Sequence, residues 1–314
     1  MTAAVHVPFV APDVATIVQG MTGRTGRRHA QLMRAYGTRI VGGVSPKSDS
    51  EEVDGVPVFK NCSEAVAATG AVASVAMVPP HSVLDAIRDA VAAGIKLIVT
   101  IAEGMPVRDA AAALEIVRAA GARWVGPSTP GLAIPGKLKL GFLPDVSLAP
   151  GPLGIMAKSG TLSYEVCHRL VGRGLGQSLW VGVGGDPVKG TRFADILPFM
   201  LTDPHTHGIV VIGEIGGSEE EQLAAAMRAL RCAKPVYALI AGRTVREGVT
   251  MGHAGAMIAG DVGTIASKTE ALASAGARVF TRIRDLVDAV TAGVGSAVPQ
   301  PFAPAKAGTQ GDRS

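Results

Sequence analysis

Short apolar runs alternate with longer helical patterns along most of this chain. The first series has five candidate strands, at residues 15–19, 39–44, 72–78, 97–101 and 123–125. The candidate helices between them span residues 26–36, 62–69, 82–93 and 107–120. Because a helix separates each strand from the next, the connections are crossovers rather than hairpins. The pattern therefore predicts a parallel, doubly wound α/β sheet.

A second series repeats this pattern later in the chain. Its candidate strands span residues 154–157, 178–183, 208–213, 236–241 and 278–280. Its candidate helices span residues 162–172, 193–201, 219–230 and 264–275. The proline-rich segment 144–152 separates the two series and indicates a linker. We expect a flexible N-terminus over 1–13, one α/β domain over 14–148, a second over 149–294, and a disordered tail over 295–314.

The composition is typical of a protein with two large cores. Of the 314 residues, 47% are hydrophobic and 18% are charged. The net charge is only +4, and basic residues are not interleaved with aromatic ones, so we expect no nucleic-acid partner. No apolar run reaches the length of a membrane span, which is about 18 residues or more. Cys62, Cys167 and Cys232 are isolated, which predicts no disulfide framework and no metal site and favours a cytoplasmic location.

A glycine-rich loop, residues 20–26, follows the first candidate strand and precedes a helix. This arrangement presents backbone N–H groups and a helix N-terminus to phosphate. Four arginines near the start of that helix favour a ligand with several phosphates; they are Arg24, Arg27, Arg28 and Arg34. A tight turn without a ligand and a solvated helix face are the simpler alternatives.

The end of the second candidate strand helps to choose among phosphate ligands. In NAD-binding domains this position usually carries a carboxylate that binds the ribose. Here the segment 42–47 contains Lys47 and no carboxylate. The lysine favours a ligand with an additional ribose phosphate, which leaves NADP and coenzyme A as candidates.

The second series carries two further candidate phosphate elements. Ser159, Gly160 and Thr161 follow a strand and open a helix, so they either cap that helix or also bind a phosphoryl group. Glu214 ends a strand among glycines, at the edge of the sheet where α/β proteins bind ligands. Its carboxylate could orient an imidazole, or it could be a solvated turn residue.

His253 lies in the segment 251–260, among glycines and alanines. An imidazole titrates near neutral pH, and its neutral form is a nucleophile. A histidine in such a loop suits a group that accepts a phosphoryl and delivers it elsewhere, whereas an incidental histidine at a helix start is the simpler alternative.

Taken together, these segments resemble the α subunit of the succinate–CoA ligase (succinyl-CoA synthetase) family, the ADP- or GDP-forming enzymes. The resemblance covers residues 15–290. It includes, in order, residues 20–26, 41–44, 100–104, 126–127, 159–165, 183–187, 212–217 and 251–256. The family implies a Rossmann-like CoA-binding domain followed by a flavodoxin-like, doubly wound α/β ligase domain.

The resemblance also implies roles for individual residues. His253 is expected to be phosphorylated during turnover and Glu214 to orient it. Ser159, Gly160 and Thr161 would stabilise the phosphohistidine, and Tyr164 would lie near the acid substrate. The residues expected to bind coenzyme A are Thr22, Gly23, Arg24, Thr25, Lys47, Ile101, Ala102 and Glu103.

The family further implies a partner. An ATP-grasp β subunit would supply the ATP or GTP site with its Mg²⁺, in an αβ or α₂β₂ assembly. The chain itself is expected to bind no metal. The reaction implied is the tricarboxylic acid cycle conversion of succinate, coenzyme A and nucleoside triphosphate to the acyl-CoA.

Several positions depart from the family pattern. Ser128 and Thr129 stand where Asn-Cys is usual, and Lys158 where arginine is usual, which is not a conservative change at a bidentate site. The segments 246–250 and 260–263, on either side of the histidine loop, differ as well. The acid could therefore be malate or another short acid. Two other classes stay open, a CoA-binding regulatory protein without turnover and an NADP-dependent oxidoreductase, although the latter does not explain His253 or Glu214.

Overall fold

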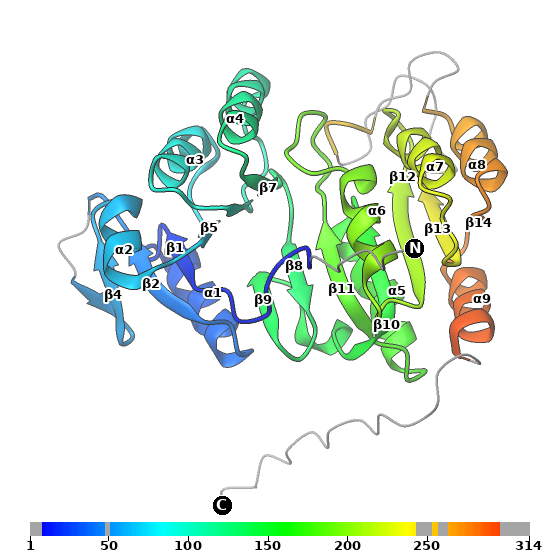
Figure 1. Cartoon of the computed structure of the whole chain (residues 1–314), viewed down its shortest axis with the longest axis horizontal. Coiled ribbons are helices and arrows are strands. Elements are labelled where there is room, and N and C mark those ends of the chain that lie inside the picture. The colour runs from blue at the N-terminus through cyan, green and yellow to red at the C-terminus, as the bar shows by residue number, and fades with distance from the viewer. Residues whose placement is uncertain (1–7, 48–50, 243–252, 257–262, 296–314) are drawn as a thin grey trace, which may run out of the picture.

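The structure is a computed structural model that describes residues 8–47, 51–242, 253–256 and 263–295. Within these residues the strands form two sheets, each of seven strands (Figure 1). The first sheet lies in the N-terminal part of the chain and the second in the C-terminal part. The predicted α/β class is confirmed.

The first sheet has the strand order β3-β4-β2-β1-β5-β6-β7. The strands are β1 (Thr16–Gln19), β2 (Ile40–Val44), β3 (Glu52–Val53), β4 (Val56–Phe59), β5 (Ala73–Ala76), β6 (Leu97–Thr100) and β7 (Arg123–Val125). All pairs are parallel except β3 with β4, a short hairpin at the edge that the sequence analysis did not predict.

Helices cover both faces of this sheet. Side chains alternate between the two faces along each strand, so each face presents apolar residues to its helices. Ile17 and Ile98 pack with α2 (Cys62–Thr69), α3 (Val83–Ala92) and α4 (Val107–Ala119), and a 3₁₀ turn, η1 (Pro80–Ser82), precedes α3. Val18 and Val99 point to the other face, where α1 (Arg24–Ala35) lies. Residues one apart along a strand therefore belong to different cores.

The second sheet has the order β14-β13-β12-β10-β11-β8-β9. Its strands are β8 (Gly131–Ile134), β9 (Leu138–Gly141), β10 (Pro150–Ala157), β11 (Gln177–Gly182), β12 (Gly208–Glu214), β13 (Val236–Ala241) and β14 (Arg278–Phe280). The five strands from β10 to β14 are parallel, as the sequence pattern predicts. β10 begins at Pro150, inside the segment expected to be a linker.

The helices of the second sheet also divide between its faces. One face carries α5 (Gly160–Val171) and α9 (Ile283–Val294), and the other carries α6 (Phe193–Thr202), α7 (Glu219–Ala229) and α8 (Ile265–Ser274). α9 lies outside the elements predicted from the sequence, although its buried residues Leu286, Val287, Val290 and Val294 follow the helical spacing.

The hairpin of β8 and β9 connects the two halves of the chain. It precedes η2 (Asp145–Ser147) and the proline-rich segment, yet β8 pairs antiparallel with β11 of the second sheet. On its other side, β9 contacts α1 of the first half, and Thr38 donates a hydrogen bond to the carbonyl of Lys139 at 2.7 Å. Strand pairing thus assigns residues 131–141 to the second sheet. The domain boundary predicted between residues 148 and 149 stays a prediction.

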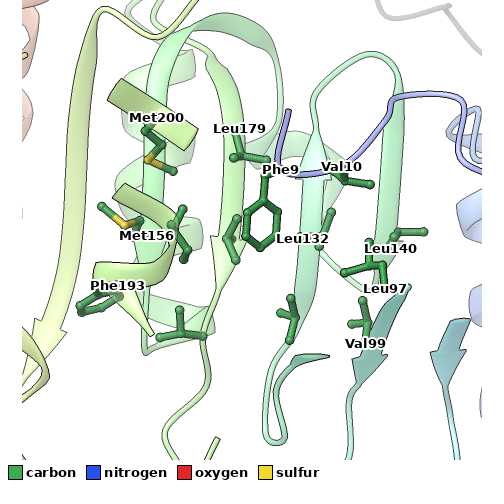
Figure 2. Close-up of a cluster of buried hydrophobic side chains, with 14 of the residues drawn as sticks. Phe9, Val10, Leu97, Val99, Leu132, Leu140, Met156, Leu179, Phe193 and Met200 are labelled. Atoms are coloured by element: carbon green, nitrogen blue, oxygen red, sulfur yellow. The ribbon is translucent and has the colours of Figure 1, made fainter. Parts of the chain in front are cut away.

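The two sheets share one hydrophobic cluster (Figure 2). Leu97 and Val99 of the first sheet, Leu132 of the hairpin and Leu179 of the second sheet all belong to it. The N-terminal Phe9 inserts between the halves, and its ring packs edge-on against Phe199 of α6 at 5.3 Å. Phe9 is thus buried although it falls in the segment expected to be flexible. Residues 1–7 and 296–314 lie outside the described part.

Each sheet has a point where the chain reverses its direction of strand addition. In the first sheet this point lies between β1 and β5, beside the glycine loop 20–26. In the second it lies between β10 and β12, beside Ser159 and Glu214. Such points are where α/β sheets bind ligands. None of the helices in the described residues is long and apolar enough to cross a membrane.

Candidate active site

His253 and Glu214 form a hydrogen-bonded pair at the carboxyl edge of the second sheet. The imidazole Nδ1 of His253 lies 2.7 Å from Oε2 of Glu214, the last residue of β12. Since the carboxylate accepts from Nδ1–H, the lone pair of the neutral ring is on Nε2. The side chain of Glu214 is only 10% exposed and that of His253 25% exposed. The structure thus brings together two residues that the sequence predicts to act together.

The environment favours the protonated form of the imidazole. The hydrogen bond from His253 to Glu214 raises the pKa of His253 above its ordinary value, and the charges of Glu214 and Glu103 act in the same direction. Burial and the charge of Lys189 act against them. Glu103 belongs to the first half of the chain, so the two halves meet electrostatically at His253.

Gly185 provides the surface on which the imidazole lies. A Cβ placed on Gly185 would lie 2.2 Å from Cγ of His253, so no side chain larger than hydrogen fits there. The N–H of Gly255 donates to the carbonyl of Gly185 at 3.0 Å and ties the histidine segment to the loop after β11. Residues 251–252 and 257–260 of the predicted loop lie outside the described residues.

The N-terminus of α5 lies at the same edge as Glu214. β10 and β12 are neighbours in register, with Ala157 opposite Ile212, and Lys158 N–H donates to Ile212 O at 3.0 Å. Ser159 caps α5, because its hydroxyl accepts the N–H of Leu162 at 3.3 Å. The predicted capping is therefore present, and the first amides of α5 stay available to an anion.

Tyr164 lies one turn into α5, next to Gly160. Its hydroxyl oxygen would be 3.1 Å from a Cβ placed on Gly160. The hydroxyl is buried and has no hydrogen-bond partner among the residues that the structure describes. Burial raises the pKa of Tyr164, so the phenol is a neutral donor at physiological pH. Because buried polar groups are usually hydrogen-bonded, this hydroxyl is a candidate donor to a bound ligand.

A cluster of buried ion pairs lies beneath these residues. It contains three lysines and three glutamates: Lys158, Lys189, Lys268, Glu219, Glu220 and Glu221. Lys158 Nζ lies 2.9 Å from Glu220 Oε1, and Lys189 Nζ lies 3.0 Å from Glu219 Oε2. Glu220 also pairs with Lys268.

The charges in this cluster compensate one another. Burial raises the pKa of Glu220, but Lys158 and Lys268 outweigh that effect and leave it lowered. Burial likewise opposes the charged form of Lys158, and the nearby Glu220 and Glu219 outweigh it and leave the pKa of Lys158 raised. Apart from Lys158, noted as a departure from the family pattern, sequence reasoning missed this cluster. Three successive glutamates at a helix start are usually solvated, and the burial of Glu219 and Glu220 has no signal in the sequence.

The residues expected to bind coenzyme A gather at the carboxyl edge of the first sheet. α1 begins at Arg24, two residues earlier than predicted, with Gly23 as a cap that makes no side-chain hydrogen bond. Its first-turn amides are thus free of a capping side chain. The hydroxyl groups of Thr22 and Ser45 lie 2.7 Å apart and connect the loop after β1 to the loop after β2.

The rest of this group surrounds the same edge. Thr25 lies exposed in the first turn of α1, and Lys47 lies exposed after β2. Ile101, Ala102 and Glu103 follow β6, and Ala102 accepts the N–H of Ser128 at 2.9 Å. Gly26 permits the close approach of loop and helix, since a Cβ there would lie 2.1 Å from Gly20 O.

Two of the four arginines expected near phosphate have another partner. Arg27 Nε donates to Asp54 Oδ2 at 2.9 Å, and Arg34 donates to the Asp54 carbonyl at 2.6 Å. Asp54 lies in the turn between β3 and β4, the hairpin that the sequence analysis did not predict. Arg27 and Arg34 are thus engaged with Asp54, and the expectation that the positive charge around this helix start favours a ligand with several phosphates stays a prediction.

Comparison with known proteins agrees with this geometry. Residues 13–104 match the family model of the CoA binding domain, and residues 156–278 match that of the CoA-ligase. The "Succinate--CoA ligase [ADP-forming] subunit alpha 1" of Archaeoglobus fulgidus is 43% identical over 282 residues, 90% of this chain and 96% of the relative. The "ADP-forming sulfoacetate-CoA ligase subunit" of Bilophila wadsworthia is 43% identical, over 87% of this chain and 94% of the relative.

A solved structure has the same fold. ATP citrate lyase from Methanothrix soehngenii superposes with a TM-score of 0.83 at 21% identity. The superposition covers 97% of this chain and 54% of that longer chain. At this identity the likeness concerns the fold. On the strength of the closer relatives, the chain belongs to the succinate–CoA ligase alpha-subunit family.

Proposed function

We propose that this chain is the alpha subunit of an ADP- or GDP-forming acid–CoA ligase that works through a phosphohistidine at His253. The observation that carries the proposal is the hydrogen bond between His253 Nδ1 and Glu214 Oε2. This bond directs the Nε2 lone pair away from the carboxylate, so Nε2 is the nucleophile. Glu214 also stabilises the positive charge that the ring acquires when it attacks a phosphoryl group.

The phosphoryl group then needs a site for its negative charge. The N-terminus of α5, at Ser159, Gly160 and Thr161, offers backbone N–H groups and the positive end of a helix dipole. The phosphoryl passes from Nε2 to the carboxylate of the acid. The thiol of coenzyme A then attacks the acyl phosphate, and inorganic phosphate leaves. Tyr164, whose buried hydroxyl has no partner in the described residues, would donate to the acid.

Coenzyme A would bind across the loop after β1 and the loop after β6. The uncapped first turn of α1 suits its diphosphate, and Lys47 suits its ribose phosphate. The nucleoside triphosphate with Mg²⁺ would bind an ATP-grasp β subunit, in an αβ or α₂β₂ assembly. The relatives' names, which describe alpha subunits of ADP-forming ligases, support a two-subunit enzyme. The three cysteines are free thiols, which supports a cytoplasmic location.

The acid is succinate or a related short acid such as malate. The sulfoacetate–CoA ligase among the relatives indicates that members of this sequence group differ in their acid. A tricarboxylic acid cycle role follows only if the acid is succinate. Of the positions that differ from the family pattern, Ser128 and Thr129 lie in the turn between the two halves, and Lys158 lies in the buried ion cluster beneath the N-terminus of α5.

The test is acyl-CoA synthesis by this chain co-expressed with its β subunit. Wild type, His253→Ala and His168→Ala are compared with a panel of short acids and both ATP and GTP. His168 is the matched control because it is an exposed histidine on α5. We expect synthesis from one acid, abolished by His253→Ala and retained by His168→Ala. Binding of coenzyme A without synthesis from any acid would instead support a regulatory CoA-binding protein.

A further inference from the structure

Asp186 occupies the junction between the two halves of the chain. It follows Gly185, which carries the imidazole of His253, and its residue exposure is only 9%. On the other side of this loop, a Cβ placed on Gly184 would lie 2.2 Å from the carbonyl oxygen of Pro127. The loop 184–186 is therefore held between the histidine segment and the turn that leads from the first sheet to the second.

Ser128 connects Asp186 to the loop that follows β6. The Ser128 N–H donates to Ala102 O at 2.9 Å, and the Ser128 hydroxyl is among the groups that hold down the pKa of the Asp186 carboxyl. The φ angle of Ser128 is 58°, in the left-handed region that residues other than glycine rarely adopt. Backbone strain of this kind is concentrated at functional sites, where the surrounding structure maintains it.

The position of the reacting thiol follows from the arrangement of the two halves. The acyl phosphate forms where the phosphoryl group leaves Nε2 of His253. Coenzyme A binds the first half, so its thiol approaches His253 from the side that faces the first sheet. The charge of Glu103, in the first half, acts on both His253 and Asp186, and the charge of His253 acts on Asp186.

We propose that Asp186 is the general base that accepts the proton of the coenzyme A thiol, an inference that rests on the proposed function. The S–H bond breaks as its proton passes to a carboxylate oxygen of Asp186. The sulfur forms a C–S bond with the acyl carbon, and the bond from that carbon to the phosphate oxygen breaks. Inorganic phosphate leaves with the electron pair, and Asp186 later returns its proton to solvent.

The surroundings of Asp186 match this role. Burial raises the pKa of its carboxyl group above the ordinary value, and the charge of Glu103 acts in the same direction. Lys189, His253 and Ser128 act in the opposite direction. A base of raised pKa is better matched to a thiol, whose pKa is about 8.5. Glu103 is exposed and has no such support from neighbouring donors among the described residues.

The test separates phosphorylation of His253 from thioester formation in the complex with the β subunit. Asp186→Asn keeps the size and polarity of the side chain but removes the basic group. The phosphoenzyme is first prepared with labelled nucleotide, and the acid and coenzyme A are then added in a rapid-quench experiment. We expect wild-type phosphoenzyme and coenzyme A affinity, with thioester formation slowed by about 100-fold or more. Asp186→Glu should restore part of the rate, and Glu103→Gln should slow it less than Asp186→Asn does.

The pH profile provides a second readout that a structural role would not change. In the wild type, thioester formation should rise with pH until Asp186 is ionised and then level off. In Asp186→Asn the rate should keep rising toward alkaline pH, because it then depends on the thiolate fraction. A wild-type rate and profile in Asp186→Asn would overturn the inference, as would loss of phosphoenzyme in that variant. Absence of phosphoenzyme in the wild type would instead refute the proposed function.

Discussion

The carboxylate of Glu220 accepts the backbone N–H of Glu214 at 3.1 Å. Glu220 is completely buried and pairs with Lys158 and Lys268, so the buried ion cluster is attached directly to the residue that orients His253. α7 thus fixes the end of β12, and through it the position of the imidazole. We therefore expect the cluster to affect catalysis by positioning the imidazole and not by contact with substrate.

Neutralising Glu220 should destabilise the protein strongly. Glu220→Gln keeps an oxygen for the Glu214 N–H but leaves two buried lysines with less opposing charge. Removal of one partner from a buried ion pair costs about 3–5 kcal/mol. Urea unfolding measures this loss. Glu165→Gln is the control, because its pair with Arg169 is on the surface and should contribute less than about 1 kcal/mol. A change in Glu220→Gln as small as in the control would contradict the account.

A methyl group at Gly185 should displace the imidazole. Gly185→Ala would bring a Cβ to 2.2 Å from Cγ of His253, so the ring has to leave its position beside Glu214. We expect loss of phosphoenzyme by at least about 100-fold, by analogy with other misplacements of reacting groups. Gly172→Ala, at the end of α5 with its closest neighbour at 3.5 Å, should leave phosphorylation unchanged. Equal phosphorylation in both variants would refute the arrangement.

The pH dependence of phosphoenzyme formation on the acid side of its pH–rate profile should depend on Glu214. Imidazolium cannot attack a phosphoryl group, so the rate rises with pH through the raised pKa of His253. Glu214→Gln removes the main cause of that shift and lowers the pKa of His253. The acid limb should therefore move to lower pH, while the maximal rate falls because the ring is less well oriented. NMR titration of His253 gives the pKa directly, and a pKa that rises in Glu214→Gln would be inconsistent with this assignment.

Tyr164→Phe tests the proposed contact with the acid. The hydroxyl has no partner in the described residues, so its removal should leave the free energy of unfolding unchanged or raise it by up to about 1 kcal/mol. The KM for the acid should rise by about 10-fold or more, the effect expected from a lost hydrogen bond to a charged group. The KM values for nucleotide and coenzyme A serve as internal controls. A loss of stability without a change in the KM for the acid would mean that Tyr164 has a structural role.

Much of the fold could be predicted because apolar periodicity follows chain order. The parallel strands and their crossover helices agree with the structure to within a few residues. The hairpins are different, since β3 with β4 and β8 with β9 are short and their partners are set by tertiary contacts. The pairing of Arg27 with Asp54 depended on one of these hairpins and could not be foreseen.

Part of the candidate site could likewise be predicted from the sequence, and part could not. His253 and Glu214 are 39 positions apart, and the ordered motifs of the family, not local pattern, suggested that they act together. Asp186 and Lys189 lie within or beside a quoted motif, but their burial and their partners depend on how the loop after β11 meets the turn at Ser128. Charged residues in a sequence are usually solvated, so a buried ion cluster becomes visible only when the sheet is assembled.

The most direct test of the account is phosphoryl transfer to His253 itself. The complex of this chain with its β subunit is incubated with γ-labelled ATP or GTP, and the label is located by peptide mapping. The account predicts an acid-labile, base-stable label on Nε2 of His253, discharged when the acid and coenzyme A are added. A complex that binds coenzyme A and synthesises the acyl-CoA without any label on His253 would contradict it.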